Sequence, residues 1–171
     1  MSIRLTDFKA NVQDLSRPNR FRLTMGGAGV ENSGGWSDKK SFLIKTAQLP
    51  NRTIGNIELN WQGMKAKIAG DAVFDDISFT FLNSYDWDIK DFFESWMELI
   101  ASMESNERTS HEDYKAEITL EQLGRTGEVL ATYTLLGAYP ISLDAVELSM
   151  DSTDTVQEVQ VSVTYDFFER R

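Results

Sequence analysis

The chain has 171 residues, a formal net charge of −10 and no cysteine. The lack of cysteine excludes disulfides, thiolate metal sites and thiol nucleophiles, and the acidic balance argues against grip on nucleic acid phosphates, which depends on Lys and Arg. The length predicts a single domain over residues 1–171 with one core. We expect no secretory signal and no membrane anchor, because no stretch approaches the roughly 20 apolar residues that span a bilayer.

The first 19 residues have apolar side chains at the spacing of a short amphipathic helix, which Arg17–Asn19 should end. The apolar positions of this predicted helix are Ile3, Leu5, Phe8, Val12 and Leu15. Alternation then predicts a strand over Phe21–Met25. Glycines between Gly26 and Gly35 predict a flexible loop, and Phe42–Leu49 is predicted to be the next strand.

Residues 50–73 contain aliphatic side chains and a tryptophan among Asn, Gln, Gly and Lys. The segment resembles a projecting hairpin arm, because it lacks the apolar density to make a core of its own. Its apolar residues therefore need burial on this domain or on a neighbour, and we favour the neighbour. The contact residues expected on the arm are Ile54, Ile57, Leu59, Trp61, Met64 and Ile68.

The period of the pattern changes after the arm. Phe74–Phe81 alternates as a strand, whereas residues 86–103 have the spacing of an amphipathic helix that begins with three aspartates, which suit the positive end of the helix dipole. The apolar stripe of this helix is Ile89, Phe92, Phe93, Trp96, Met97, Ile100 and Met103. A stripe of this kind is far more often packed on a sheet than used as a ligand pocket, so we expect it in the core.

The last third of the chain returns to strands after a polar linker over residues 104–113. Tyr114–Leu120 and Val129–Leu135 form a predicted hairpin, and a second excursion follows through Leu143. Val156–Phe167 alternates throughout and predicts one long half-buried strand. Its apolar face is Val159, Val161, Val163, Tyr165 and Phe167.

The sequence contains few candidate motifs for catalysis or for binding of a cofactor or metal. The single histidine, His111, has Ser110 and Asp113 close by, but neighbours on one loop rarely satisfy the geometry of a catalytic triad. Gly26–Gly29 lacks the helix and the lysine of a phosphate-binding loop. Carboxylates are plentiful, which is a weak signal in an acidic chain. We therefore expect no catalytic, cofactor-binding or metal-binding residue, and a function that depends on assembly.

Three groups of segments together resemble the tail tube proteins of contractile-tailed bacteriophages, in an order and spacing that extend over nearly the whole chain. The segments are Arg17–Phe21; Ala47–Pro50, Lys67–Asp71 and Phe74–Phe81; and Leu136–Pro140, Val146–Val156 and Tyr165–Glu169. The resemblance implies a mainly β fold, a β-sandwich or half-barrel with one flanking α-helix. It also implies that six copies close into a ring whose channel is lined by β-sheet, and that rings stack into a tube.

The same resemblance implies further partners in a virion tail assembled in the host cytoplasm: a sheath protein, a baseplate tube-initiator, a tape-measure protein and a tail terminator. DNA would pass through the lumen without specific binding, for which an acidic or neutral wall is suited. Two alternatives stay open at this point. The protein could belong to the tube of a related machine, such as a tailocin, a type VI needle or an extracellular injection system, or it could be a monomeric β-sandwich binding module.

Overall fold

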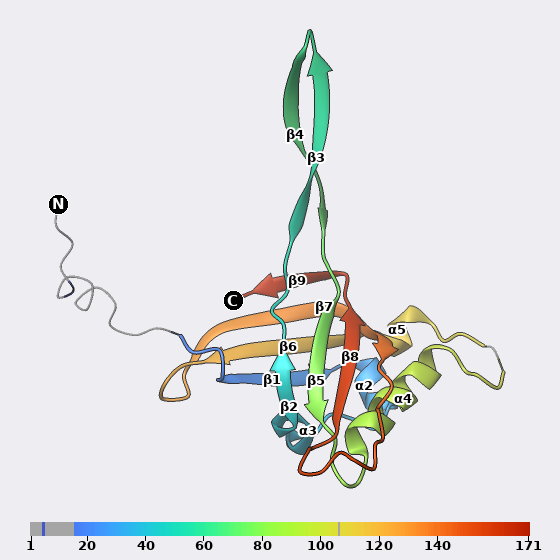
Figure 1. Cartoon of the computed structure of the whole chain (residues 1–171). Coiled ribbons are helices and arrows are strands. Elements are labelled where there is room, and N and C mark those ends of the chain that lie inside the picture. The colour runs from blue at the N-terminus through green and yellow to red at the C-terminus, as the bar shows by residue number, and fades with distance from the viewer. Residues whose placement is uncertain (1–4, 6–15, 106) are drawn as a thin grey trace.

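The computed structural model describes residue 5, residues 16–105 and residues 107–171, so the helix predicted over residues 1–19 falls almost wholly outside the described part of the chain. Nine strands and four helices follow one another in the described residues (Figure 1). In chain order they are β1 Phe21–Gly26, α2 Ala28–Asn32, α3 Asp38–Phe42, β2 Ile44–Ala47, β3 Thr53–Trp61, β4 Met64–Val73, β5 Ile77–Leu82, α4 Asp88–Ile100, α5 His111–Tyr114, β6 Ala116–Leu123, β7 Val129–Leu143, β8 Glu158–Thr164 and β9 Phe167–Arg170.

Seven of the strands form one bent sheet in the order β1-β6-β7-β8-β5-β2, with β9 also paired to β7. The 15-residue strand β7 joins two parts of this sheet, because its first part pairs with β6 and β9 and its last part pairs with β8. We call β1, β6, β7 and β9 the four-stranded half, and β2, β5 and β8 the three-stranded half. The halves cross in Figure 1, as in a sandwich or half-barrel, so the predicted mainly β fold is confirmed.

The core lies between the two halves and α4. Alternate residues of β5 and β8 point into it, and Phe79, Phe81 and Val161 are fully buried. From α4, the side chains of Ile89, Phe92, Phe93 and Trp96 complete the core, which confirms the predicted helix and most of its stripe. Trp96 is fully buried, and its Nε1 donates a hydrogen bond to the carbonyl oxygen of Tyr114 at 2.8 Å. The helix ends at Ile100, so Met103 is 90% exposed and its place in the stripe was wrong.

The glycine-rich segment departs from the prediction of a flexible loop. Residues Ala28–Asn32 form α2, which buries Val30 in the core. Gly29 packs so closely on the chain near Tyr114 that a Cβ there would lie 2.0 Å from the Tyr114 carbonyl oxygen. The predicted strand Phe42–Leu49 is also shorter, because Phe42 ends α3 and is 85% exposed, and only Ile44–Ala47 pair as β2.

The C-terminal half contains two corrections of a different kind. Residues 136–143 are the continuation of β7 rather than a second excursion. The predicted strand Val156–Phe167 is divided into β8 and β9 by a break at Tyr165–Asp166, where the Asp166 amide donates to the Leu136 carbonyl. The break reverses the alternation, so Phe167 is 46% exposed and Phe168 packs on the core instead. The predicted polar linker also contains a short helix, α5.

Candidate assembly surfaces

The hairpin β3–β4 projects from the rest of the molecule as an arm, as the sequence predicts (Figure 1). Its strands have nine and ten residues and are therefore about 30 Å long. They are joined by a two-residue turn in which Gln62 and Gly63 both have positive φ, 45° and 85°. Such a turn matches the twist of the paired strands, and glycine tolerates the left-handed backbone at no steric cost.

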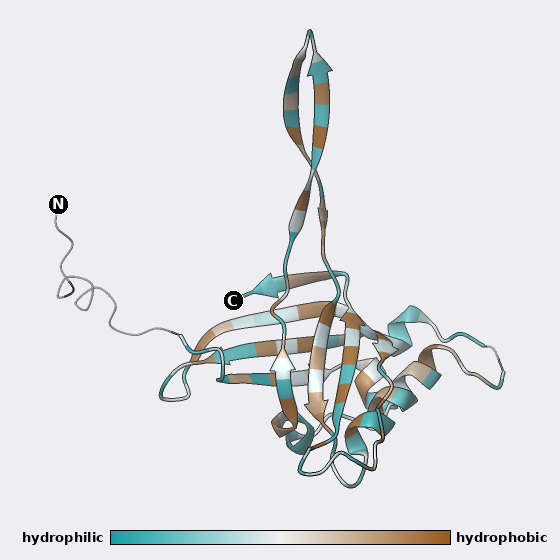
Figure 2. Cartoon of the chain, viewed as in Figure 1, coloured by the Kyte–Doolittle hydropathy of each residue, from teal (hydrophilic) through white to brown (hydrophobic). Residues whose placement is uncertain are grey.

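The arm has one apolar face and one polar face. Register places Ile57 opposite Ile68, Leu59 opposite Ala66 and Trp61 opposite Met64, and directly opposed residues share a face. The other face has Glu58 opposite Lys67, and Lys65 forms an ion pair with Glu58 at 2.9 Å. Figure 2 shows the resulting bands of apolar and polar residues along the arm.

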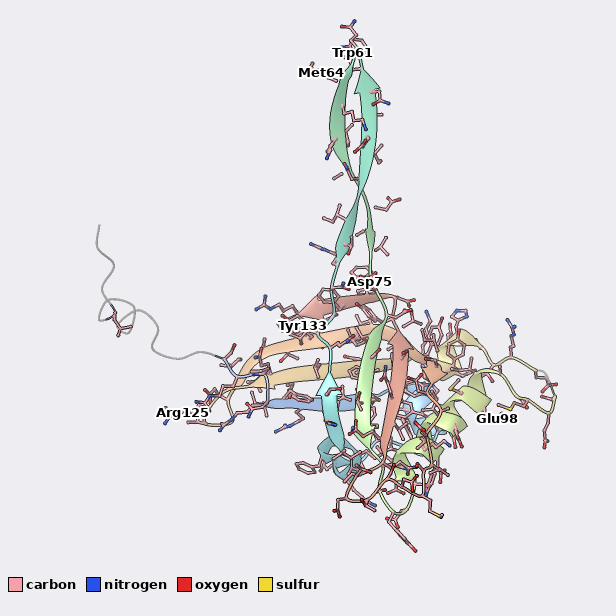
Figure 3. All side chains as sticks on the ribbon, in the orientation of Figure 1. Trp61, Met64, Asp75, Glu98, Arg125 and Tyr133 are labelled. Carbon is pink, nitrogen blue, oxygen red and sulfur yellow. The ribbon has the colours of Figure 1, made fainter. Side chains whose placement is uncertain are left out.

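None of the six arm residues predicted as contact residues is covered by its own domain. Their exposed fractions run from 50% at Leu59 to 71% at Met64. Five of them share the apolar face, whereas Ile54 lies beyond an irregularity in the pairing and by alternation belongs with Glu58. Trp61 and Met64 lie at the tip, far from Asp75 at the base (Figure 3). An apolar face of this length that is open to water is typical of a protein–protein contact.

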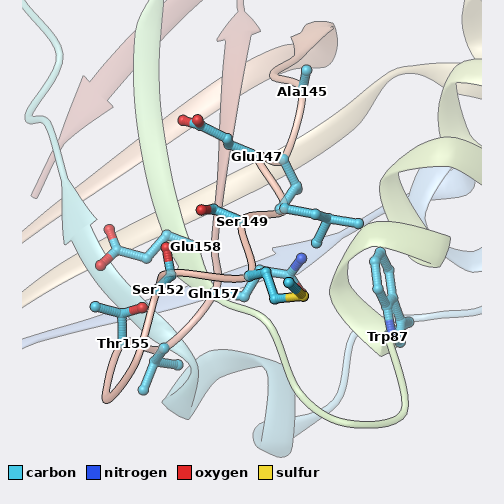
Figure 4. Close-up of a pocket in the computed structure, with 12 residues that line it drawn as sticks. Trp87, Ala145, Glu147, Ser149, Ser152, Thr155, Gln157 and Glu158 are labelled. Carbon is cyan, nitrogen blue, oxygen red and sulfur yellow. The ribbon is translucent and has the colours of Figure 1, made fainter.

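A second exposed apolar surface lies at the opposite end of the domain. The loop of residues 144–157, between β7 and β8, forms a surface hollow with Trp87 at its side (Figure 4). We call this surface the end hollow and define its apolar residues as Trp87, Leu148, Met150 and Val156. Leu148 is 80% exposed and Met150 fully exposed. Sequence reasoning missed this surface; the available signal was two large apolar residues in an acidic, turn-rich segment.

Ion pairs and hydrogen bonds join the segments that surround the end hollow. The Lys39 ammonium group donates to the carboxylates of Asp86 and Asp88 at 2.9 and 2.6 Å and so joins α3 to the start of α4. The hydrogen bond from Lys39 lowers the pKa of Asp88, and the two aspartates raise the pKa of Lys39. Asn83 bonds Gln157 through both its backbone amide and its side-chain amide, at 2.9 Å each. These contacts fix the base of the loop.

The four-stranded half has an uncovered polar face. Its paired residues include Arg22 with Glu121, Thr119 with Thr134, and Thr134 with Glu169. The polar residues on this face are Arg22, Thr24, Glu117, Thr119, Glu121, Thr132, Thr134, Glu169 and Arg171, and Leu136 with Phe167 form one apolar pair among them. In the described part of the chain, β1 pairs only with β6 and β9 only with β7, so both outer edges of this half are free.

Other kinds of site find little support in the described residues. His111 lies in the short exposed helix α5, and no group of three metal-ligating side chains comes together in residue 5, 16–105 or 107–171. Within the same ranges no helix has the length and apolarity to cross a bilayer. The features that remain are surfaces: the arm, the end hollow and the four-stranded half with its free edges.

Comparison with known proteins agrees with a role in assembly. The phage tail tube protein family matches residues 12–171. The tail tube protein of Serratia phage KSP90 is 28% identical over 152 residues, covering 88% of this chain and 86% of the relative. The tail tube protein gp19 of Enterobacteria phage T4 is 26% identical over 159 residues, covering 91% and 92%.

Similarity of fold extends to a chain of an extracellular contractile injection system. The relevant structure is a cryo-EM structure of the PVC sheath–tube complex of such a system in its extended state. One of its chains is 17% identical to this chain, with a TM-score of 0.60, and the match covers 99% of each chain. The family match and the two phage relatives confirm the resemblance to contractile tail tube proteins that the sequence suggested. This chain belongs to the phage tail tube protein family, whose members are structural components of the virion tail.

Proposed function

We propose that six copies of this chain close into a ring, that rings stack into the inner tube of a contractile tail, and that DNA passes through the bore during ejection. The observation that carries the proposal is the arm. It is a strand pair about 30 Å long whose apolar face is exposed, and burial of that face against another copy would remove this apolar surface from water. The role is structural and involves no chemical turnover.

Ring closure follows from the free edges of the four-stranded half. Unpaired strand edges promote aggregation in a lone subunit, and a closed ring removes that hazard by covering or pairing each edge. The edge at β1 and the edge at β9 lie on opposite sides of the same sheet, with β6 and β7 between them. Copies joined edge to edge through these strands would continue the sheet around a bore.

The uncovered polar face of this half is suited to the wall of the bore. It contains Glu117, Glu121 and Glu169 and two arginines. Arg22 forms an ion pair with Glu121 and Arg171 one with Glu169, each at 3.6 Å, so neither arginine is left as a free positive charge. Duplex DNA has about one negative charge per 1.7 Å of its axis, so a basic wall would hold it at many points. A wall of threonines and glutamates, whose two arginines are paired with glutamates, leaves the DNA free to slide.

Stacking of rings is a head-to-tail contact, which has no natural end. The length of the tube must therefore be limited by other components. The partners we propose are a baseplate tube-initiator, a tape-measure protein and a tail terminator, with a sheath protein around the tube. The fold shared with a chain of a sheath–tube complex supports the last of these.

The arm provides the test. Replacing Leu59 and Trp61 by Ser removes two large side chains from the apolar face without touching the core. We expect a soluble, folded monomer that no longer forms tubes in negative-stain electron microscopy. The matched control replaces Asn56 and Asn60, on the other face, by Ser and should form normal tubes. Normal tubes from the Leu59 and Trp61 variant would refute the proposal.

The alternative function is the tube of a related contractile injection system, and the fold shared with a chain of the PVC sheath–tube complex supports it. The two machines differ in cargo. Electron microscopy of particles from producing cells separates them, because a phage tail is attached to a DNA-filled capsid and an injection system is not.

A further inference from the structure

We propose that the apolar face of the arm of one copy binds the end hollow of a copy in the next ring. The inference rests on the proposed stacking of rings and adds the surface that receives the arm. It commits both partners to the same chain, so each copy would give its arm to one neighbour and accept an arm from another.

The two surfaces lie at opposite ends of the same strands. Ile77, which follows the arm, pairs with Val163, whereas Leu82 at the other end of β5 pairs with Glu158, which follows the loop of the end hollow. The six residues of β5 separate the two ends by about 20 Å. Figure 1 shows the arm above the sheet and the loop between β7 and β8 below it. A head-to-tail contact requires two different surfaces placed in this way.

The surfaces also match in chemical character. The tip of the arm presents Trp61 and Met64, which are 68% and 71% exposed. The end hollow presents Trp87, 38% exposed, beside Leu148 and Met150. Methionine adapts to irregular apolar surfaces and packs well on aromatic rings. Each surface has one tryptophan and one methionine, so the methionine of either surface can pack on the tryptophan of the other.

Charge favours the same pairing. The loop of residues 144–157 has four carboxylates and neither Lys nor Arg; the carboxylates are those of Asp144, Glu147, Asp151 and Asp154. Among the described residues, none of these four takes part in an ion pair of the structure. The outer part of the arm, residues 57–68, has Lys65 and Lys67 against one acid, Glu58. Both lysines lie on the polar face of the arm, so they would flank the apolar contact and not enter it. In a chain of net charge −10, copies repel one another, and lysines at this distance from the acidic loop reduce that repulsion.

The end hollow is already formed in the single copy. Trp87 has a left-handed backbone, φ 57°, immediately before α4. Its ring faces the loop across the hollow in Figure 4. The loop itself is held at its base by the bonds between Asn83 and Gln157. A preformed receiving surface avoids part of the ordering cost of association.

The absence of natural cysteine allows a direct test by cross-linking. Met64→Cys at the arm tip is combined with Met150→Cys in the end hollow, and assembled tubes are treated with a short bismaleimide. On a denaturing gel we expect a ladder that continues beyond the number of subunits in one ring, because each covalent link joins successive rings. The matched control combines Met64→Cys with Met103→Cys, a 90% exposed position outside the end hollow, and should give no ladder.

If the arm binds somewhere other than the end hollow, the gel will differ, and each of the following three results overturns the inference. Tubes that form without a ladder place the arm elsewhere. A ladder that stops at the size of one ring places the contact between neighbours in the same ring. Dimers from Met64→Cys alone indicate that two arms bind each other. In all three cases the tubes are present, so the proposed function survives. A protein that forms no tubes without any substitution contradicts the proposed function itself.

Charge reversal gives a second measurement that needs no cross-linker. We expect Lys65→Glu with Lys67→Glu to shorten tubes about tenfold, and Glu147→Lys with Asp151→Lys to do the same, since each removes the complementarity. The chain with all four changes should form longer tubes than either pair alone. If the loop changes leave tube length unaltered while the arm changes shorten it, the arm does not bind the end hollow.

Discussion

The arm and the core around α4 are built from similar side chains and differ in what covers them. Both contain a tryptophan among aliphatic residues: Trp96 in α4 is fully buried, whereas Trp61 at the arm tip is 68% exposed. The apolar residues of α4 meet the sheet of their own chain, and those of the arm meet solvent in the single copy. The same apolar content therefore stabilises the fold in one region and is left for contact between copies in the other.

The largest loss of fold stability is expected from a substitution at Trp96. Trp96→Ala removes a fully buried indole and its hydrogen bond to Tyr114, and should lower the free energy of unfolding by about 3–5 kcal/mol. Urea denaturation of the Leu59→Ser, Trp61→Ser background measures the effect without a contribution from assembly. A loss below about 1 kcal/mol would contradict the place of α4 in the core.

Gly29 tests the close packing of α2 on the same core. A Cβ at this position would lie 2.0 Å from the Tyr114 carbonyl oxygen and 2.7 Å from Nε1 of Trp96. Gly29→Ala should therefore lower the free energy of unfolding by about 1–3 kcal/mol, the usual cost of overpacking. The matched control is Gly26→Ala, where nothing lies within 4 Å of the added Cβ. Equal effects at the two glycines would argue against the close contact of α2.

Trp61, which is exposed, should contribute little to the stability of the single copy, unlike the buried Trp96. Trp61→Ala should change the free energy of unfolding of the unassembled protein by no more than about 0.5 kcal/mol, because the side chain has no cover in its own domain. Thermal or urea unfolding at a concentration below that of assembly measures it. A loss as large as that of Trp96→Ala would mean that the arm packs on its own domain in solution.

The smallest effect concerns the pH dependence near the end hollow. Because Lys39 lowers the pKa of Asp88, the contact stabilises the fold at neutral pH, and this contribution disappears as the pH falls through the lowered pKa. Lys39→Met should raise the pKa of Asp88 toward the ordinary aspartate value in an NMR titration. Lys90→Met, which removes the ion pair with Glu94, is the control and should leave Asp88 unchanged. An unaltered Asp88 pKa in the Lys39 variant would contradict the contact.

The elements that the sequence predicted well are those that depend on neighbours along the chain. The helix predicted over residues 86–103 and the hairpin arm follow from periods of side chains within one segment. Both are present, the helix with the shorter range Asp88–Ile100. The apolar face of the arm could also be predicted, because alternation alone places Ile57, Leu59 and Trp61 on one side. What covers that face in the assembly stays a proposal.

The elements that the sequence predicted poorly depend on segments far away along the chain. The glycine-rich segment forms α2 because Val30 and Gly29 pack against the region of Trp96 and Tyr114. Strand β7 continues past Pro140, which lies beside a bulge in the pairing with β8, a position where the missing amide hydrogen is tolerated. The break at Asp166 likewise depends on its bond to Leu136.

The sequence by itself determined the alternating strands, the one long helix, the amphipathic arm and the resemblance to tail tube proteins, since each is a property of local pattern or of motif order. Only the tertiary structure decided that β7 joins two halves of a sheet with free edges, and that Trp87 meets the loop of residues 144–157 in a hollow opposite the arm. The physical reason is that period and parity describe which residues share a face, whereas the partner of that face is chosen by contacts between distant segments.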